Sequence, residues 1–290
     1  MHKIVHHIDA FSSVPGKGNP AGVVVETERL DDDAMQSIAK AVGFNECVFV
    51  FPSERADFRF RFFTPGHEMP LCGHATVAAA SFLGAQAGES RTFTIETRAG
   101  VLPVSYDAAT HFVTMRHAEP EFRTFAGDRG ALARVLGVGA DCFLPDLPIV
   151  YGSTGTWTLL VPVAEKRVML AMKPETAAFP GVLAEMPRVS IHPFVIADHA
   201  EGMDFVARHF SSPYSGTVED PVTGTASGVM GAYAMQHMHP DADEMRFVVA
   251  QGESVNRDGR VHVHVARRNG GMEVSISGAA AQVGVLPITY

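Results

Sequence analysis

The pattern of hydrophobic and polar positions predicts short strands that alternate with helices along the first part of the chain. Runs of β-branched and aromatic residues indicate strands over 23–25 and 47–51, and strict alternation indicates a half-exposed strand over 58–62. Between the first two strands, apolar residues recur at helical spacing behind a run of aspartates, which predicts a helix over 30–42. Both element types are therefore expected in this part of the chain.

Two segments of similar character lie far apart in the chain. Small and apolar residues occupy nearly every position over 75–83 and over 226–235, which is typical of a helix buried on all sides. A glycine opens each segment, Gly73 or Gly224, and paired strand patterns follow each of them. The common offset of 224 − 73 = 151 residues suggests an internal duplication. The mixed order of strands, hairpins and helices favours an α+β fold over a wound parallel sheet.

Two other glycine-bearing stretches are interpreted as turns. Residues 16–22 match neither the GxGxxG fingerprint nor a Walker loop, so this stretch is expected to be a turn after the first strand. Gly152 and Gly155, with two prolines just before them, are expected to be turns early in the second half.

Length and composition limit the class of protein. A chain of 290 residues suggests about two domains, and 46% hydrophobic with only 19% charged residues excludes wholesale disorder. The net charge of −9 argues against nucleic acid or an anionic membrane surface as the main partner. No apolar run reaches the ~18 residues of a membrane span, and the first residues show no secretory signal. Three cysteines do not make a disulfide framework, so the expected location is the cytoplasm.

The first candidate site is the segment Cys72-Gly73-His74, at the start of the first buried helix. Unpaired backbone amides at a helix N-terminus carry partial positive charge and bind carboxylates well. His74 could donate a hydrogen bond to the same anion. The alternative is a tight turn into a core helix, in which Cys72 is a small buried hydrophobe.

The second candidate site, from Asp220 to Thr225, has the same order of a turn, a glycine and a small-residue helix. If the halves are pseudo-symmetric, the helix N-termini at Gly73 and Gly224 could face one cleft and hold a small carboxylic acid. The alternative is that Asp220 merely caps the turn before Pro221.

Glu46 is the third candidate, because it stands just before an apolar strand, where partial burial would suit a general base. The alternative is an exposed acid at the start of a strand. The histidines and cysteines fit no familiar metal-ligand spacing, so no metal site is expected, and the sequence has no GxSxG elbow. One of the dispersed arginines Arg116, Arg208 and Arg246 could pair with a substrate carboxylate.

Several short motifs occur in order and together span most of the chain. They are Asp9-Ala10-Phe11, Gly18-Asn19-Pro20-Ala21-Gly22, Asn45-Glu46, Phe63-Thr64-Pro65, Cys72-Gly73-His74-Ala75-Thr76, Glu219-Asp220-Pro221-Val222-Thr223-Gly224 and Gly252. This ordered set resembles the PhzF-type phenazine-biosynthesis isomerase family, which has the diaminopimelate-epimerase fold.

The resemblance implies two pseudo-symmetric lobes, each a barrel-like mixed sheet around a central helix, with the active site in the cleft between them. The expected lobes are 1–117, completed by a returning strand over 279–290, and 118–278. Members of the family are typically cofactor-free homodimers. The resemblance therefore implies no cofactor, a small carboxylic acid as substrate and a second copy of the chain as partner.

The resemblance also assigns roles to single residues. The catalytic glutamate of the family falls on Glu46, and a small hydroxyl residue, often serine in the family, falls on Thr225. The residues expected to bind substrate are Asn19, Cys72, Gly73, His74, Asp220, Gly224 and Thr225.

The expected activity is that of a cofactor-independent isomerase, in which Glu46 removes a proton from one carbon of the acid and returns it to another. Epimerases of the superfamily use two cysteines; Cys72 fits the first position, but Thr223 stands at the second, which disfavours a two-thiol mechanism. Two alternatives stay open. One is a Cys72-dependent epimerase or dehydratase of a small, cyclic amino acid, and the other is a non-catalytic protein that binds small acids.

Overall fold

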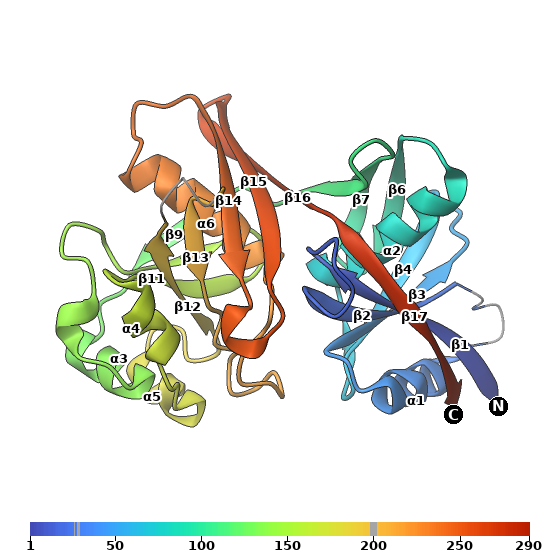
Figure 1. Ribbon diagram of the computed structural model, residues 1–290, viewed down its shortest axis with the longest axis horizontal. Coiled ribbons are helices and arrows are strands. Elements are labelled where there is room, and N and C mark those ends of the chain that lie inside the picture. Colours follow the sequence, from blue (N-terminus) through green and yellow to red (C-terminus); the bar gives the residue numbers. More distant parts are fainter. Residues whose placement is uncertain (26, 28–29, 198–201) are drawn as a thin grey trace. The chain divides into compact units, whose positions relative to one another are not determined.

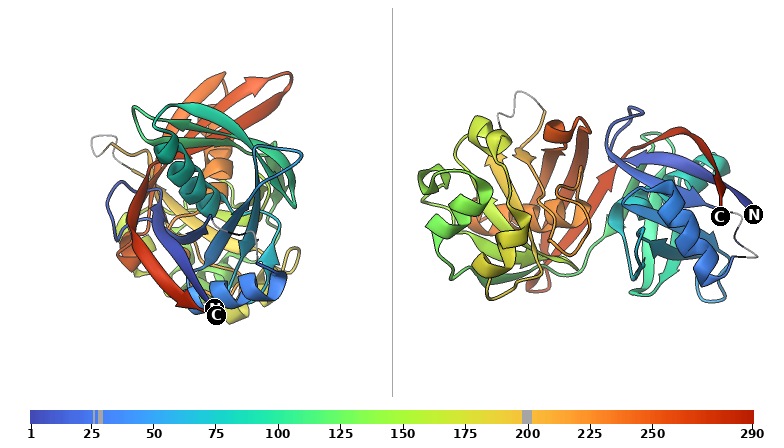
Figure 2. Two further views of the ribbon diagram at one scale, coloured as in Figure 1. Left: turned by 90° about the vertical axis from the view of Figure 1, so that its right-hand side faces the viewer. Right: turned by 90° about the horizontal axis from the view of Figure 1, so that it is seen from below.

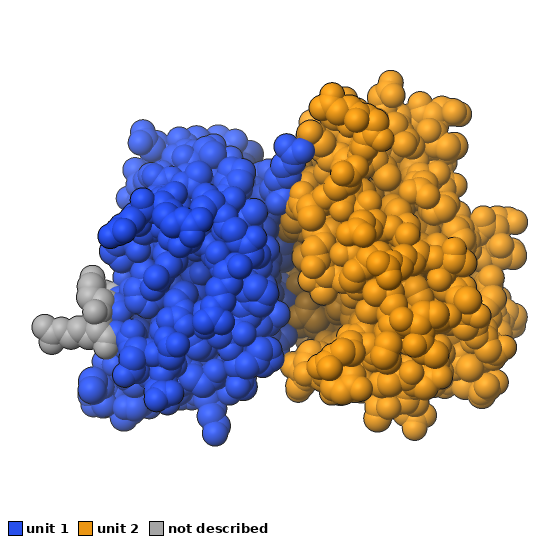
Figure 3. Space-filling model, turned by 180° about the vertical axis from the view of Figure 1, so that it is seen from behind, with its two compact units in different colours: residues 1–116, 277–290 blue, residues 117–276 orange. Residues whose placement is uncertain are grey.

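The chain folds into two compact units in a computed structural model that describes residues 1–25, 27, 30–197 and 202–290. The first unit comprises Met1–Arg116 together with Ser277–Tyr290, and the second comprises His117–Ile276 (Figure 3). Among the described residues, no helix is both long enough and apolar enough to cross a bilayer.

The first unit is built on one mixed sheet. Its strands follow the order β17-β1-β2-β3-β4-β6-β7-β8, and the short strand β5 pairs with β4. The β2–β3 and β4–β6 pairs are parallel, whereas β1–β2, β3–β4 and β6–β7 are antiparallel. The bounds are β1 His2–Ala10, β2 Asn19–Val24, β3 Glu46–Phe51, β4 Phe58–Phe63, β5 Glu68–Met69, β6 Arg91–Thr97, β7 Gly100–Asp107, β8 Phe112–Arg116 and β17 Ala280–Thr289.

The two ends of the chain meet in this unit. Strand β17 runs antiparallel to β1 along its whole length, and the amino group of Met1 donates to the carbonyl of Tyr290 at 2.9 Å. The last strand is therefore an integral part of the first unit (Figure 1).

Helix α2, Gly73–Ala87, is the centre of the first unit. Residues 74–81 and Gly84 are buried, because the helix carries small and apolar side chains on all sides. It contacts β1, β2, β3, β7, β8 and β17, so the strands lie around it rather than under it (Figure 2, left). The sheet must curl because a flat sheet would cover only one side of such a helix.

Helix α1, Asp32–Val42, packs on the outside of the same sheet. Met35 and Ile38 from the helix join Phe49 and Phe63 from the strands in a second apolar cluster. The helix begins after Asp31, whose side chain accepts from the amide of Ala34 at 2.8 Å. This N-cap is the local reason why the helix starts where the aspartate run predicted.

The second unit repeats the design. Its strands follow the order β9-β10-β11-β12-β13-β14-β15-β16. The β11–β12 and β13–β14 pairs are parallel, whereas β9–β10, β10–β11, β12–β13 and β14–β15 are antiparallel. The bounds are β9 Glu121–Thr124, β10 Val150–Ser153, β11 Trp157–Pro162, β12 Ser190–Ile196, β13 Phe205–Ala207, β14 Glu244–Gln251, β15 Gly259–Arg268 and β16 Gly271–Gly278.

Helix α6, Gly224–His237, takes the central place in the second unit and contacts β10, β11, β14 and β15. Gly152, expected to be a turn, instead lies within β10. A Cβ at this position would come within 2.7 Å of Cγ2 of Val229 on α6, so the glycine allows the helix to approach the strand. Asn19, expected in a turn, likewise begins β2.

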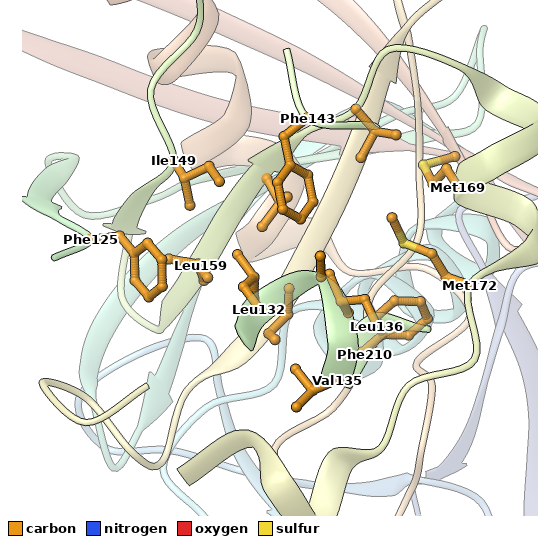
Figure 4. Packing of buried hydrophobic residues seen from close by; sticks show 14 of the residues in the cluster. Phe125, Leu132, Val135, Leu136, Phe143, Ile149, Leu159, Met169, Met172 and Phe210 are labelled. Carbon is orange, nitrogen blue, oxygen red and sulfur yellow. The ribbon is translucent and has the colours of Figure 1, made fainter. Parts of the chain in front are cut away.

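Short helices cover the outer side of the second sheet. They are α3 Arg129–Leu136, α4 Lys166–Ala171 and α5 Phe179–Val182, with 3-10 turns at Ala140–Cys142, Thr176–Ala178 and Glu253–Val255. Leu132 and Leu136 from α3 and Met169 from α4 pack into one apolar cluster with strand residues (Figure 4). Phe179 from α5 belongs to the same cluster.

The two units repeat the same sequence of strand pairings. From β1 to β7 in the first unit the pairs are antiparallel, parallel, antiparallel, parallel and antiparallel, and from β10 to β15 in the second they follow the same order. In each unit the central helix joins the later parallel pair, β4–β6 or β13–β14. The expected α+β class, with a mixed sheet curled around a central helix, is confirmed.

Gly84 offers a test of how tightly the first sheet encloses α2. A Cβ there would lie 2.2 Å from Cγ and 2.8 Å from Cβ of Tyr106, atoms close to the β7 backbone. Gly84→Ala should therefore lower the free energy of unfolding by about 1–3 kcal/mol through overpacking, although alanine is the better helix former. Chemical denaturation measures the loss.

Gly181→Ala in α5 is the matched control, because a Cβ there would meet nothing within 4 Å. This variant should stay within about 0.5 kcal/mol of the wild type. Equal stability of the Gly84 and Gly181 variants would contradict close packing of α2.

Candidate functional site

Four polar or thiol side chains of the first unit gather at the start of α2. Glu46 is the first residue of β3 and Asn19 the first of β2, whereas Cys72 immediately precedes α2 and His74 lies in its first turn. We call Asn19, Glu46, Cys72, Gly73 and His74 the first half-site. Strand pairing fixes its frame, because Glu46 stands opposite Ala21 in the parallel β2–β3 ladder.

The imidazole of His74 connects the members of the first half-site. Its Nε2 lies 3.1 Å from Oε2 of Glu46, and its Nδ1 lies 3.5 Å from Sγ of Cys72 and 3.3 Å from Nδ2 of Asn19. The ring is thus held on both sides, and only 8% of it is exposed.

Burial and charge act in opposite directions in the first half-site. Burial lowers the pKa of His74, but the neighbouring Cys72 and Glu46 outweigh it, so that the pKa stands well above its ordinary value. Burial raises the pKa of the Cys72 thiol, and the charge of Glu46 raises it further. Near neutral pH these shifts favour an imidazolium–carboxylate pair beside a neutral thiol.

The backbone at the start of α2 adds donors to the same place. Cys72 occupies the N-cap position but its side chain makes no capping hydrogen bond. The amides of the first turn, from Gly73 onward, therefore keep the partial positive charge of a helix N-terminus. A carboxylate at this point would meet both the amides and the imidazolium.

Helix α6 begins in a similar way in the second unit. Its N-cap, Thr223, makes no capping hydrogen bond, because its hydroxyl donates to Oδ2 of Asp220 at 2.5 Å. Gly224 and Thr225 form the first turn. We call Asp220, Thr223, Gly224 and Thr225 the second half-site.

Gln251 holds the loop of the second half-site in place. Its Nε2 donates to the carbonyl of Asp220 at 2.8 Å, and its Oε1 accepts from the amide of Thr223 at 3.2 Å. The next residue, Gly252, has a φ of +100°, and a Cβ there would lie 2.2 Å from the carbonyl oxygen of Arg257. A glycine is therefore required where the Gly252 motif stands.

A buried polar layer supports the same loop, and sequence reasoning missed its role. Arg208 donates to both oxygens of Glu219, at 3.0 and 2.7 Å, and its Nη1 donates to the carbonyls of Met169, Leu170 and Met172. The sequence analysis offered Arg208 as a possible partner of a substrate carboxylate. In the structure it pairs with the carboxylate of Glu219 instead. The one signal for this polar layer in the sequence is the acidic residue Glu219, which directly precedes Asp220.

His209 continues this layer, because its carbonyl accepts from the amide of Asp220 at 2.9 Å. Its Nδ1 lies 3.2 Å from Nδ1 of His192, and both rings are buried. Burial lowers the pKa of both histidines, and for His192 the proximity of His209 lowers it further. Neutral histidines therefore underlie the loop that carries Asp220.

The structure thus brings the expected site residues together within each unit. Asn19, Glu46, Cys72, Gly73 and His74 lie together in the first, and Asp220, Gly224 and Thr225 lie together in the second. That the two half-sites line one cleft stays a prediction.

Comparison with known proteins gives the family. The model of the phenazine biosynthesis-like protein family, PhzC-PhzF, matches residues 8–284. The chain belongs to this family.

Individual relatives align with this chain over nearly its whole length. It is 46% identical to the uncharacterized isomerase YfhB of Bacillus subtilis, with 94% of each chain covered. It is 31% identical to the trans-2,3-dihydro-3-hydroxyanthranilate isomerase of Pseudomonas aeruginosa, with 97% of each covered. A crystal structure of a PhzF-family protein from Bacillus anthracis aligns over 100% of both chains at 44% identity and a TM-score of 0.96. The expected family is confirmed, and the names of the two curated relatives agree with the expected isomerase class.

His117 links the start of α6 to the rest of the second unit. Its Nδ1 lies 3.1 Å from Oγ1 of Thr154, which in turn donates to the carbonyl of Thr225 at 3.1 Å. Gly228 leaves room for the ring, because a Cβ there would lie 2.7 Å from Nδ1 of His117. Burial lowers the pKa of His117 from 6.5 to about 4.

This buried imidazole predicts acid sensitivity. Between pH 6.5 and about 4 the unfolded chain binds a proton that the folded chain excludes, so stability falls as the pH falls through this range. His117 alone should contribute up to about 3 kcal/mol to that loss. In His117→Gln, which keeps a polar side chain near Thr154, the free energy of unfolding should fall less between these pH values, as measured by denaturant titration. An identical loss in variant and wild type would assign the acid sensitivity elsewhere.

Proposed function

We propose that this protein is a cofactor-independent isomerase that moves a proton within a small carboxylic acid, with Glu46 as the general acid and base. The observation that carries the proposal is the first half-site, where Glu46 faces His74 at 3.1 Å beside the N-terminus of α2. Membership of the PhzC-PhzF family supports the same reaction class.

Glu46 is suited to take and return a proton. Its side chain is 14% exposed, so a substrate can reach it while water has little access. In the proposed reaction it removes a proton from one carbon of a conjugated acid and returns it to another, and the electron pair shifts along the conjugated bonds. The reaction is balanced without an external oxidant or reductant. A positioned general base of this kind is worth ~10²- to 10⁴-fold in rate.

The start of α2 supplies the complementary positive field. A substrate carboxylate would dock on the amides near Gly73, and His74 would donate to a polar substituent or to the developing negative charge. Once Glu46 has accepted the proton it is neutral, and the charge of His74 is then free to stabilise the anionic intermediate. Fixed donors cost little reorganisation during such a step.

The name of one relative supports the class of substrate. The Pseudomonas aeruginosa protein is named for trans-2,3-dihydro-3-hydroxyanthranilate, a cyclic amino acid with a carboxylate and ring double bonds. We propose a related small cyclic acid as the substrate here. In this proposal Asp220, Gly224 and Thr225 contact the same substrate, as the family resemblance implies, and the protein acts as a homodimer in the cytoplasm.

A second candidate activity depends on Cys72. The sulfur lies 3.5 Å from Nδ1 of His74, a contact suited to proton exchange in a dehydratase or epimerase. Two observations weigh against it. The pKa of the thiol is raised, and the place of a second thiol is taken by Thr223, whose hydroxyl is committed to Asp220.

Glu46→Gln tests the proposed base. This variant should lose ~10²- to 10⁴-fold in kcat/KM while its thermal unfolding stays close to that of the wild type. The assay uses the hydroxyanthranilate named above and a panel of small cyclic amino acids, with product analysis by NMR. Glu89→Gln, an exposed glutamate of the same unit, is the matched control and should keep full activity. Wild-type turnover by Glu46→Gln would remove Glu46 from the mechanism.

Cys72→Ser separates the two candidate activities. The proposed isomerase should keep its turnover within about tenfold, whereas a thiol-dependent dehydratase or epimerase should lose the ~10²- to 10⁴-fold of an acid–base group. Reactions run in deuterium oxide also separate an enzyme from a non-catalytic binding protein, because only proton transfer yields rearranged or deuterated acid. Tight binding of the whole panel without any rearranged or deuterated product would favour the binding protein.

A further inference from the structure

The first half-site presents three different metal-binding groups at one point. An oxygen of Glu46, the sulfur of Cys72 and a ring nitrogen of His74 all lie within 4.8 Å of one another. Zinc and related thiophilic cations prefer this combination of nitrogen, sulfur and carboxylate ligands. Magnesium and calcium select oxygen ligands instead.

Two of the three spacings between these atoms are close to those of a tetrahedral site. Bond lengths of about 2.0 to 2.3 Å at a zinc ion place neighbouring ligand atoms roughly 3.5 Å apart. Here Nε2 of His74 lies 3.1 Å from Oε2 of Glu46 and 4.0 Å from Sγ of Cys72. Shifts of about half an ångström would bring both pairs to that spacing.

The three groups stand on well-fixed backbone. Glu46 is held in the β2–β3 ladder, and Cys72 and His74 are tied to the start of α2, where the carbonyl of Cys72 accepts from the amide of Thr76 at 3.0 Å. Such a frame limits the rearrangement that a metal ion would require.

One oxygen of the Glu46 carboxylate lacks a hydrogen bond within the described residues. Oε2 of Glu46 is buried and, among the described residues, forms no hydrogen bond, although it lies at ion-pair distance from His74. A bound cation would replace the imidazolium as the counter-charge of this buried oxygen and would coordinate it directly.

We infer that the first half-site is a binding site for a thiophilic divalent cation of the zinc class, which inhibits the enzyme reversibly. The cation is bound by Glu46, by the thiolate of Cys72 and by neutral His74, and a water molecule completes the tetrahedron. Binding releases the proton of the thiol and the extra proton of the imidazolium to solvent, with no change of oxidation state. Occupied in this way, Glu46 is no longer free to accept a substrate proton; this inhibition rests on the proposed function, whereas the binding does not.

Cobalt is the first probe, because Co²⁺ bound to a thiolate shows a sulfur-to-metal charge-transfer band in the near ultraviolet. Titration of metal-free full-length protein with Co²⁺ should produce this band with one equivalent bound. The band should vanish in Cys72→Ser and persist in the matched control Cys142→Ser, which alters a half-buried cysteine of the other unit. Surface histidines can bind cobalt but give no sulfur band. Absence of the band from the wild type, or its persistence in Cys72→Ser, overturns the inference.

Zinc competition gives the second measurement and does not depend on the folding of Cys72→Ser. Zinc should displace the bound cobalt from the wild type, and Glu46→Gln, which keeps the thiol and the side-chain shape, should bind cobalt at least tenfold more weakly. Unchanged affinity in Glu46→Gln would exclude the carboxylate as a ligand.

The two proposals can fail separately. If Glu46→Gln keeps its turnover while the wild type shows the cobalt band, the proposed base is wrong and the metal site stands. If Glu46→Gln is inactive but the wild type gives no band, the metal site is wrong and the base stands. In the proposed case zinc inhibits wild-type turnover in step with displacement of the cobalt band, and a chelator restores activity.

Discussion

Each unit depends on the complete burial of one helix. Helices α2 and α6 have no charged face, so apolar surface must cover them from all sides. Strands therefore surround each helix, and in the first unit the last strand is β17, from the far end of the chain. Small side chains let the strands come close, as Gly84 does beside Tyr106 and Gly152 does beside Val229. The two half-sites lie where these central helices begin.

The charges of the first half-site balance one another. An imidazolium at a helix N-terminus is disfavoured by the dipole, and Glu46 offsets that cost by its contact with His74. The neutral thiol of Cys72 adds no charge near neutral pH. The same balance sets the chemistry, because any proton that moves to Glu46 leaves the positive charges of His74 and the helix start uncompensated. A substrate anion, or a developing one, is what that field would then stabilise.

The parts of the fold that the sequence predicts are those with strong local signals. The helix that follows Asp31 has an N-cap and an apolar stripe. Both central helices begin with a glycine and consist mainly of small and apolar residues, which makes them recognisable in the sequence. Gly152 was misjudged because its role is to let α6 approach, and no neighbour in sequence reveals that. The pairing of Arg208 with Glu219 is likewise a tertiary contact across the unit. The contacts of His74 with Asn19 and Glu46 join residues from three elements, so only the family resemblance could group them.

The helix starts within this one chain differ in a way that bears on function. Asp31 and Asp128 cap α1 and α3 through their carboxylates, which occupy amides that would otherwise be free. Cys72 and Thr223 stand at the same position of the two central helices and make no such bond. The short helices α4 and α5 also lack a side-chain cap, so an uncapped start is not by itself the mark of a site. At α2 the uncapped start coincides with Glu46 and His74, and in the proposed function its amides bind the substrate carboxylate.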